Sequence, residues 1–456
     1  MKKSIRKSGN KMEFSSLVFL FRFLPVFLII YYLVPVRYRN LILVLGSIFF
    51  YGCGDLRYLP LVAASVIINC ILVWQMDSYS RETRNRRWIL IFLILLNLGA
   101  LLVFKYTSYP MPLGMSFYTF TVLSYVLDVY MGRARAEKSP VNAAAYLLMF
   151  PKLISGPIAE YAEMQPEVRE RRYSLRDVEE GVVIFVLGLG FKVVLANHFG
   201  MLWHDIRSAG FESISTPLAW IGAVGYSAEL FFDFQGYSLM AIGVGRMLGF
   251  HLPKNFDHPY RSTTVAEFYR RWHITLGLWF RNYLYIPLGG NRKGTKRTIF
   301  NLFLVWALTG IWHGATINFL IWGLVLFVLI AGEKLCWGKF LNQHAWLGRI
   351  YIWFLIPLTW VVFAVEKLGD LGAYFMRLFP FWGAAASVNQ TDYVRYLRNY
   401  TLFFVLAFLV SLPFMDKLYE KYHTKLWFKA VAFVIFAVCV YEMSNGLNNP
   451  FLYFQF

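Results

Sequence analysis

"FYRRWHITLGLWFRNYLYIPLGGNRKG" at residues 268–294 and "TGIWHGATINFLIWG" at residues 309–323 set the architecture of this chain. Each segment carries a histidine directly after a tryptophan, His273 in the first and His313 in the second, within sequence apolar enough to lie in a membrane. Ionisable side chains are costly at that depth, so they usually face a cavity or a partner. We therefore expect both histidines to line a cavity and the rest of the chain to form its wall.

The composition is that of an integral membrane protein. Of the 456 residues, 58% are hydrophobic and 16% are charged, whereas soluble domains carry roughly 25% charged residues. A polytopic helical bundle is expected to form one domain at this length. We predict an all-α, multi-pass membrane domain over residues 14–456, with its catalytic core at 253–323, after a basic extension at 1–13.

Apolar stretches recur along the whole chain and predict about eleven to thirteen membrane segments, because a span needs ~20 apolar residues. The stretch 41–51 is too short to cross a membrane alone. The stretch 141–158 contains the helix breakers of "FPKLISGP" and lies between two basic clusters, so a full crossing would put positive charge on both faces. A broken or re-entrant segment fits this pattern, since irregular backbone is tolerated where it lines a protein cavity. The stretches are 14–34, 41–51, 56–74, 88–104, 113–131, 141–158, 181–198, 217–234, 239–252, 319–330, 350–365, 400–414 and 426–443.

The net charge of +19 is concentrated in short loops at 81–87, 133–138, 169–176 and 292–297. Basic loops mark the cytoplasmic side of a membrane protein, and they attract anionic lipid headgroups. Binding of an anionic cytosolic donor is a second interpretation, compatible with the first. Nucleic acid is not expected as a partner. Met12 is an alternative start, which would make the basic residues before it an artefact of the assigned start.

His313 and His273 are the candidates for chemistry. A neutral imidazole is well suited to take a proton from a hydroxyl near neutral pH, and glycines on both sides of the Trp312–His313 pair allow a substrate to approach closely. A buried histidine that only joins helices is the alternative for His313. His273 either orients a substrate or bonds to another functional side chain.

Further polar residues surround the two histidines in the sequence. The arginines either hold the phosphates of a charged donor or extend to lipid headgroups, and the asparagine, which opens an apolar run, is a candidate helix cap. These residues are Arg270, Arg271, Arg281 and Asn301. The sequence contains no G-x-S-x-G, no H-E-x-x-H and no C-x-x-C motif, so we expect neither a serine hydrolase nor a metal site.

Several motifs together resemble the membrane-bound O-acyltransferases, in particular the membrane subunits of bacterial alginate O-acetylation. The resemblance runs from residue 14 to the end of the chain. It rests on "FSSLVFLFRFLP", "PKLISGPIAEY", "FDFQGYSLMAIGVGRMLGF", "PKNFDHPY", "EFYRRWHITLGLWFRNYLYIPLGGNR", "GIWHGATINFLIWG" and "NPFLYFQF". The region 369–398 carries nothing specific to the family.

The resemblance implies a ring of helices around a central tunnel, with the family's invariant histidine at His313 and its second histidine at His273. It implies an O-acetyltransferase of the bacterial cell membrane that uses acetyl-CoA as a donor substrate and has no tightly bound cofactor. An extracytoplasmic partner, similar to SGNH-type esterases, would pass the acetyl group to a polysaccharide acceptor. Trp272 or Trp312 could polarise the thioester carbonyl through their indole N–H groups.

Three other functions stay open at this point. One is transfer of D-alanine or another acyl group to a wall polymer, although "PLGGNR" at 287–292 favours the acetyl branch. Another is a non-enzymatic transporter of polysaccharide or lipid, whose broken segments would line the substrate path. The third is a scaffold without enzymatic activity, in which both histidines would be dispensable.

Overall fold

The computed structural model describes residues 12–382, 389–446 and 451–452, and within these it is helical, with no strand. The basic extension before Met12 lies outside the described residues, as do parts of region 369–398 and of the C-terminal tail. Contacts divide the chain into two compact units. The first comprises residues 1–181, 240–252 and 443–448, and the second comprises 182–239, 253–442 and 449–456.

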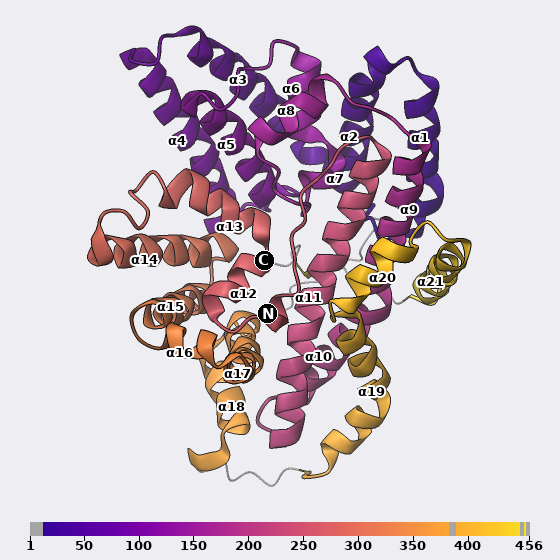
Figure 1. Ribbon diagram of the computed structural model, residues 1–456, viewed down its shortest axis with the longest axis vertical. Coiled ribbons are helices and arrows are strands. Elements are labelled where there is room, and N and C mark those ends of the chain that lie inside the picture. Colours follow the sequence, from indigo (N-terminus) through magenta and orange to yellow (C-terminus); the bar gives the residue numbers. More distant parts are fainter. Residues whose placement is uncertain (1–11, 383–388, 447–450, 453–456) are drawn as a thin grey trace. The chain divides into compact units, whose positions relative to one another are not determined.

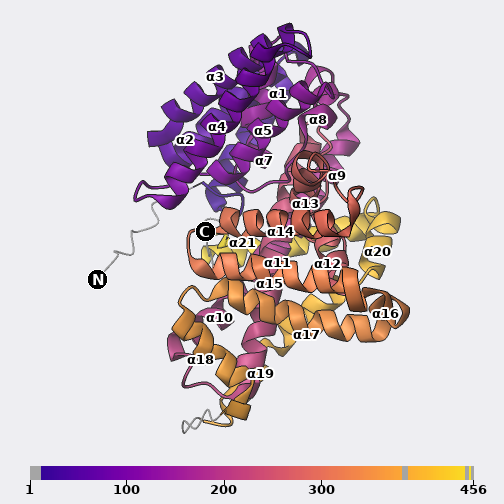
Figure 2. The ribbon, with the colours of Figure 1, turned by 90° about the vertical axis from the view of Figure 1, so that its left-hand side faces the viewer.

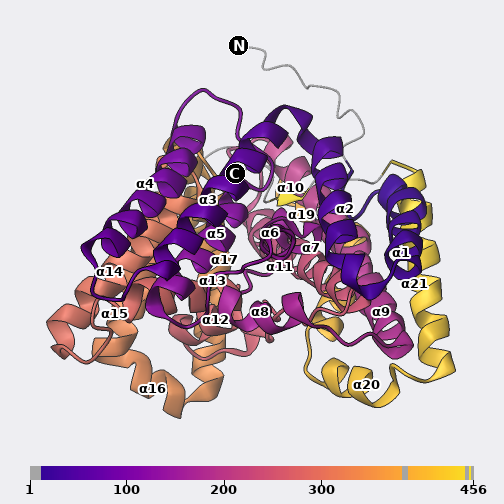
Figure 3. The ribbon, with the colours of Figure 1, turned by 90° about the horizontal axis from the view of Figure 1, so that it is seen from above.

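The first unit contains eight complete α-helices and the ends of others. Figure 3 shows α3, α4 and α5 packed beside one another. The Asn97 amide on α4 donates a hydrogen bond of 2.8 Å to the Asn69 side chain on α3, a polar clamp typical of membrane helix pairs. The helices are α1 (Leu24–Leu33), α2 (Arg39–Asp55), α3 (Leu59–Ser78), α4 (Arg84–Tyr106), α5 (Met115–Met131), α6 (Pro140–Leu148), α7 (Phe150–Leu153) and α8 (Tyr161–Arg169), with the start of α9 (Leu175–Gly190) and the end of α11 (Thr216–Met247).

The break expected within 141–158 is confirmed. Helix α6 ends at Leu148, and the four-residue α7 follows after Met149. Pro151 lies in the first turn of α7, where its missing N–H costs nothing. Phe150 anchors the break, because its ring packs edge-on against Phe23 and Phe27 with centroids 5.4 and 5.2 Å apart.

The second unit carries the two motif segments. Figure 1 shows the long helix α11, of which residues 216–239 belong to this unit, and Figure 2 shows α14, α15 and α17 running alongside one another. The remaining elements are η4 (Phe191–Ala196), α10 (Asn197–Ala209), η5 (Pro259–Arg261), α12 (Val265–Arg271), α13 (Ile274–Phe280), η6 (Arg281–Tyr285), α14 (Gly294–His313), α15 (Ile317–Gly332), η7 (Glu333–Trp337), α16 (Gly338–Gln343), α17 (Ala345–Ala364), α18 (Leu368–Leu378), α19 (Asp392–Val410), α20 (Phe414–Tyr422) and α21 (Leu426–Ser444).

Two glycines bring α14 and α15 together. A Cβ added at Gly310 would lie 2.6 Å from the Phe319 carbonyl oxygen, and one added at Gly323 would lie 2.5 Å from the Trp306 carbonyl oxygen. Small residues at helix crossings allow this close backbone approach in membrane proteins. The crossing fixes the last turn of α14, where His313 lies.

The expectation of separate segments at 217–234 and 239–252 is wrong, because α11 runs unbroken from Thr216 to Met247. The polar residues between the two apolar runs are accommodated by packing inside the protein. Gly236 lets α11 approach the Gly188 carbonyl, and the Ser238 hydroxyl accepts a hydrogen bond from the Asn255 amide at 3.0 Å. A buried ion pair of 2.5 Å, between Lys192 and Asp233, ties η4 to the same helix.

Six helical segments are long and apolar enough to cross a membrane in the described part of the chain, or seven if the bent pair α19 and α20 counts as one span. The stretch 41–51, too short by itself, lies in a helical segment of 43 residues, Val36–Ser78. The charged residues between the stretches 400–414 and 426–443 are largely helical, since α20 covers Phe414–Tyr422 and meets α19 at 70°. The count of eleven to thirteen segments stays a prediction.

Candidate active site

His313 is the last residue of α14, and Gly314 ends the helix in extended backbone. The imidazole is 6% exposed and is enclosed by aromatic rings. Trp322 meets it edge-on with ring centroids 5.0 Å apart, Phe363 does so at 5.2 Å, and the Trp312 ring lies at 4.6 Å. These ring contacts restrict the orientation of the imidazole.

His273 lies in the turn between α12 and α13, and its φ of 47° is rare for a residue other than glycine. Its side chain is 4% exposed. The ring packs edge-on against Phe234 of α11, with centroids 4.6 Å apart, and its Nδ1 lies 3.2 Å from the Asn255 Oδ1. The direction of this side chain is therefore set by the turn and its neighbours rather than by a helix.

Both histidines line one cavity of about 470 Å³ within the second unit. Trp272 also lines it, and the Trp312 ring neighbours both histidines, with its centroid 6.4 Å from that of His273 and 4.6 Å from that of His313. Arg270 and Arg281 are exposed residues of the same lining. The cavity thus combines two imidazoles, several indoles and two guanidinium groups, which suits an acyl ester with an anionic carrier.

Two predicted site residues lie elsewhere. Arg271 does not line the cavity, because its guanidinium is paired with Glu267 at 3.0 Å and with Asp257 at 3.1 Å. Asn301 is not a helix cap: α14 begins seven residues earlier, at Gly294, and the buried Asn301 amide donates to the Gly290 carbonyl at 3.0 Å. Asn301 thus ties the "PLGG" turn to the middle of the helix.

The sequence suggested no role for two further residues of the site, Trp322 and Asn255. Trp322 lines the cavity, is 2% exposed, and its indole N–H has no acceptor among the residues that the structure describes. Asn255 reaches His273 from the segment 253–260. Both lie in quoted motifs, "GIWHGATINFLIWG" and "PKNFDHPY". Their importance depends on contacts between distant segments, which no local pattern reveals.

The helix that leads to His273 is held at its first turn. The Thr264 hydroxyl accepts from the Glu267 N–H at 3.1 Å, and the buried Glu333 carboxylate accepts from the N–H groups of Val265 and Ala266 at 2.5 and 2.9 Å. Burial alone would raise the pKa of Glu267, but hydrogen bonds from Thr263 and the ion pair with Arg271 lower it overall. These contacts make α12 a firm support despite its seven residues.

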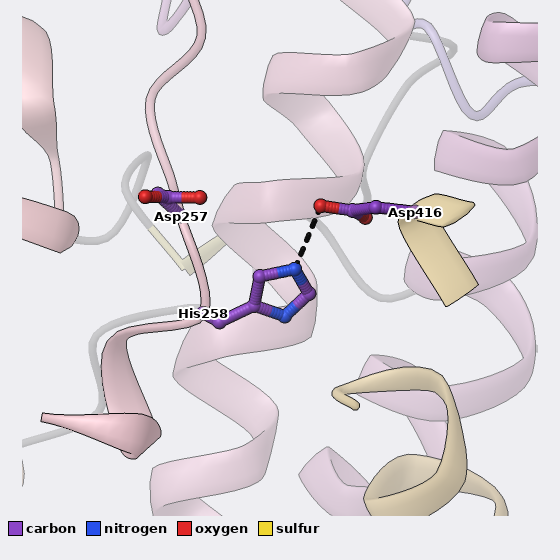
Figure 4. A group of neighbouring side chains, drawn as sticks. All are labelled: Asp257, His258 and Asp416. Carbon is purple, nitrogen blue, oxygen red and sulfur yellow. Dashed lines mark hydrogen bonds and ion pairs between the residues drawn. The ribbon is translucent and has the colours of Figure 1, made fainter. Parts of the chain in front are cut away.

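A second polar cluster, drawn in Figure 4, is joined to α12 through the ion pair of Asp257 with Arg271. The ligand atoms of Asp257, His258 and Asp416 lie within 4.8 Å of one another. Asp257, however, is paired with Lys254 and Arg271, and the His258 ring spans the Ser411 carbonyl at 2.9 Å and Asp416 at 2.8 Å. These partners make the cluster a link between segment 253–260 and α20, so we assign it no metal.

Comparison with known proteins places this cavity in a family. The family model for the membrane-bound O-acyltransferases matches residues 56–365, more than half of the chain. A probable alginate O-acetylase, AlgI of Pseudomonas fluorescens, is 38% identical over 81% of this chain and 76% of its own length. A peptidoglycan O-acetyltransferase of Helicobacter pylori is 32% identical over 78% of this chain and 77% of its own.

A teichoic acid D-alanyltransferase of Lacticaseibacillus rhamnosus is more distant, at 28% identity over 61% of this chain and 75% of its own length. All three names describe transfer of an acetyl or D-alanyl group, to alginate, peptidoglycan or teichoic acid. The matched region contains both histidines and every residue of the cavity named above. The chain belongs to the membrane-bound O-acyltransferase family.

Proposed function

We propose that this protein takes an acetyl group from cytosolic acetyl-CoA and moves it across the membrane for O-acetylation of an extracellular or cell-wall polysaccharide. The single observation that carries the proposal is the joint placement of His313 and His273 in one cavity whose lining includes Arg270 and Arg281. The names of the alginate and peptidoglycan O-acetyltransferases support acetyl as the acyl group.

The proposed reaction needs one general base and one hydrogen-bond donor to the carbonyl oxygen of the thioester. His313 takes the proton of the attacking hydroxyl as its oxygen bonds to the thioester carbonyl carbon. The carbon–sulfur bond then breaks, and the proton passes to the leaving thiolate, which gives an acetyl ester and free CoA thiol. An imidazole in this role contributes ~10²–10⁴ in rate. The indole N–H of Trp322 is suited to stabilise the oxyanion, because it is buried beside His313 and has no acceptor in the described structure.

The arginines are suited to bind the coenzyme that carries the acetyl group, rather than the reacting atoms. Guanidinium groups bind phosphate with two parallel hydrogen bonds, and the coenzyme carries its phosphates far from the thioester. Arg270 and Arg281 are exposed at the cavity, whereas Arg271 has carboxylate partners of its own. Arg270 and Arg281 are therefore the proposed phosphate ligands. An extracytoplasmic partner of the SGNH-esterase type would receive the acetyl group and pass it to the polymer.

The test measures alkali-labile acetate on surface polysaccharide in cells that lack the protein and carry back one of three versions of it. These are the wild type, His313→Ala, and a matched control, His344→Ala, whose side chain is exposed and outside the cavity. All three must be present at equal abundance in the membrane. We expect acetate with the wild type and the control but not with His313→Ala.

Two results would overturn the proposal. Acetate that is equal in all strains, including the one without the protein, would show that the protein does not acetylate the polymer. Esterified D-alanine that depends on His313, with acetate unchanged, would show that the transferred group is D-alanine, as in the name of the more distant relative.

A further inference from the structure

Asn255 and His273 meet although eighteen residues separate them in the chain. The main chain of segment 253–260 runs against the turn that carries His273. The Asn255 carbonyl accepts from the Ile274 N–H at 2.9 Å, and the Asp257 N–H donates to the Arg271 carbonyl at 3.0 Å. Phe256 and Trp272 form an antiparallel bridge between these two contacts. The side chain of Asn255, itself 1% exposed, is thereby placed against the imidazole.

The orientation of the Asn255 amide follows from its other partners. Its Oδ1 receives the Thr275 N–H at 3.3 Å and the Thr275 hydroxyl at 2.7 Å, and its Nδ2 donates to the Ser238 hydroxyl at 3.0 Å. A backbone N–H can only donate, so the atom facing Thr275 is the amide oxygen. The amide cannot be turned over without placing its NH₂ group against that donor.

This orientation decides which nitrogen of His273 carries the proton. The Nδ1 atom lies 3.2 Å from the same Asn255 oxygen, which can only accept. Nδ1 must therefore donate, and in a neutral imidazole the lone pair then belongs to Nε2. A His273 side chain in this state accepts a hydrogen bond at Nε2 and cannot donate one there.

We propose that Asn255 is a positioning residue that holds His273 protonated on Nδ1, so that Nε2 accepts a hydrogen bond from an N–H or O–H group of the substrate in the cavity. The role of His273 is then to hold a substrate donor group, and polarising the thioester carbonyl falls to the indoles. The statement about the substrate rests on the proposed function, whereas the statement about the tautomer rests on the contacts alone.

The tautomer can be measured directly. Nitrogen NMR of the purified full-length protein labelled with ¹⁵N-histidine distinguishes a protonated ring nitrogen from one with a lone pair, and His273→Gln identifies the signals of His273. We expect Nδ1–H and unprotonated Nε2 in the wild type, and a shift toward the other tautomer in Asn255→Leu. The control is Asn97→Leu, another buried asparagine, which should leave these signals unchanged. A wild-type proton on Nε2, or an unchanged tautomer in Asn255→Leu, would overturn the proposal.

Activity supplies an independent readout. By analogy with metal-binding histidines, where loss of the orienting partner costs ~10–100-fold, we expect a loss of that size in Asn255→Leu. Adding Asn255→Leu to His273→Gln should cause little further loss. An increase in KM for acetyl-CoA would place the bound donor group on the coenzyme arm, and an increase in KM for the acceptor would place it on the hydroxyl substrate. Unchanged kcat and KM would contradict the substrate role even with the tautomer confirmed.

Asn255→Asp tests the same idea in a variant that keeps the shape of the side chain. Its carboxylate still accepts from His273 and Thr275, but it favours the doubly protonated imidazolium. The acidic limb of the pH–activity profile should therefore move to higher pH, because Nε2 loses its lone pair earlier as the pH falls. A profile identical to that of the wild type would contradict the proposal. If no acetyl transfer is found in any variant, the proposed function fails while the NMR result still decides the tautomer.

Discussion

At the scale of the residue, the site depends on polar side chains that the fold holds inside an aromatic enclosure. That His313 and His273 line a cavity could be predicted from the sequence, because histidines are conspicuous in apolar surroundings and each follows a tryptophan. Asn255 and Trp322 could not be assigned a role, since a buried amide or an indole without an acceptor is recognised only when its neighbours are known. The sequence could not show that Arg270 lines the cavity and Arg271 does not, because Asp257, the partner of Arg271, lies fourteen residues away in the chain.

Trp322→Phe removes the indole N–H while it keeps an aromatic ring beside His313. Loss of one donor to an oxyanion typically costs ~10²-fold or more in kcat. We expect a decrease of about that size, with a smaller change in KM, measured as acetyl transfer at saturating donor. Trp346→Phe, an exposed tryptophan, serves as the control. Unaltered kcat in Trp322→Phe would remove this side chain from the chemistry.

At the scale of the element, a helix crossing and a capped short helix position the two histidines. The crossing of α14 and α15 holds the end of α14, and the capped α12 holds the turn at His273. The broken segment at α6 and α7 was predictable from its prolines and glycine. The continuity of α11 was not, because the polar residues that interrupt its apolar pattern are accommodated by packing against Gly188 and Asn255.

Gly310→Ala tests the helix crossing. The added methyl group would lie 2.6 Å from the Phe319 carbonyl oxygen, so the helices must move apart and displace His313, three residues further along α14. Overpacking of this kind costs ~1–3 kcal/mol, and a displacement of ~1 Å can lower a rate ~10²-fold. We expect activity to fall more than thermal stability. Gly372→Ala, where the methyl group meets nothing within 4 Å, should have little effect, and equal behaviour of the two variants would argue against the crossing as a support.

Glu267 makes the stability of α12 dependent on pH. Its pKa is lower in the folded protein than the ~4.3 of an unfolded glutamate. Its contribution to stability is therefore present at neutral pH and is lost as the pH falls through the lowered pKa. In Glu267→Gln the unfolding temperature should lie below that of the wild type at pH 7, and the difference should shrink on acidification. The exposed Glu82→Gln is the control. A difference that stays constant from pH 7 down to below this lowered pKa would contradict the assignment.

At the scale of the whole molecule, this is a multi-pass membrane acyltransferase whose composition alone identified its environment. The fold class was predictable because hydropathy dominates such sequences. The number of spans was harder to predict, since 41–51 joins a longer helical segment, Val36–Ser78, and the runs 217–234 and 239–252 share one helix, Thr216–Met247, with a polar middle. Hydropathy counts apolar residues and does not register polar groups that are paired inside the protein.

The sidedness of the molecule can be tested at two loops. The basic residues at 292–297 and at 169–176 predict that both loops are cytoplasmic. The helical segment Leu175–Ala209, which follows the second loop, then crosses the membrane and brings Ser213 to the opposite face. In a cysteine-free variant, Lys296→Cys should react with an impermeant thiol reagent only after spheroplasts are permeabilised, and Ser213→Cys should react in intact ones. Labelling of Lys296→Cys in intact spheroplasts would reverse the assignment.

The central claim is that His313 drives acetyl transfer from acetyl-CoA on the cytoplasmic face. Inverted membrane vesicles from cells without the native protein, carrying the wild type, His313→Ala or His344→Ala at equal abundance, are given ¹⁴C-acetyl-CoA on the outside, and alkali-labile label on polysaccharide is counted. The account predicts label with the wild type and with His344→Ala, and ~10²–10⁴-fold less with His313→Ala. Equal label with His313→Ala, or no label with the wild type, would contradict it.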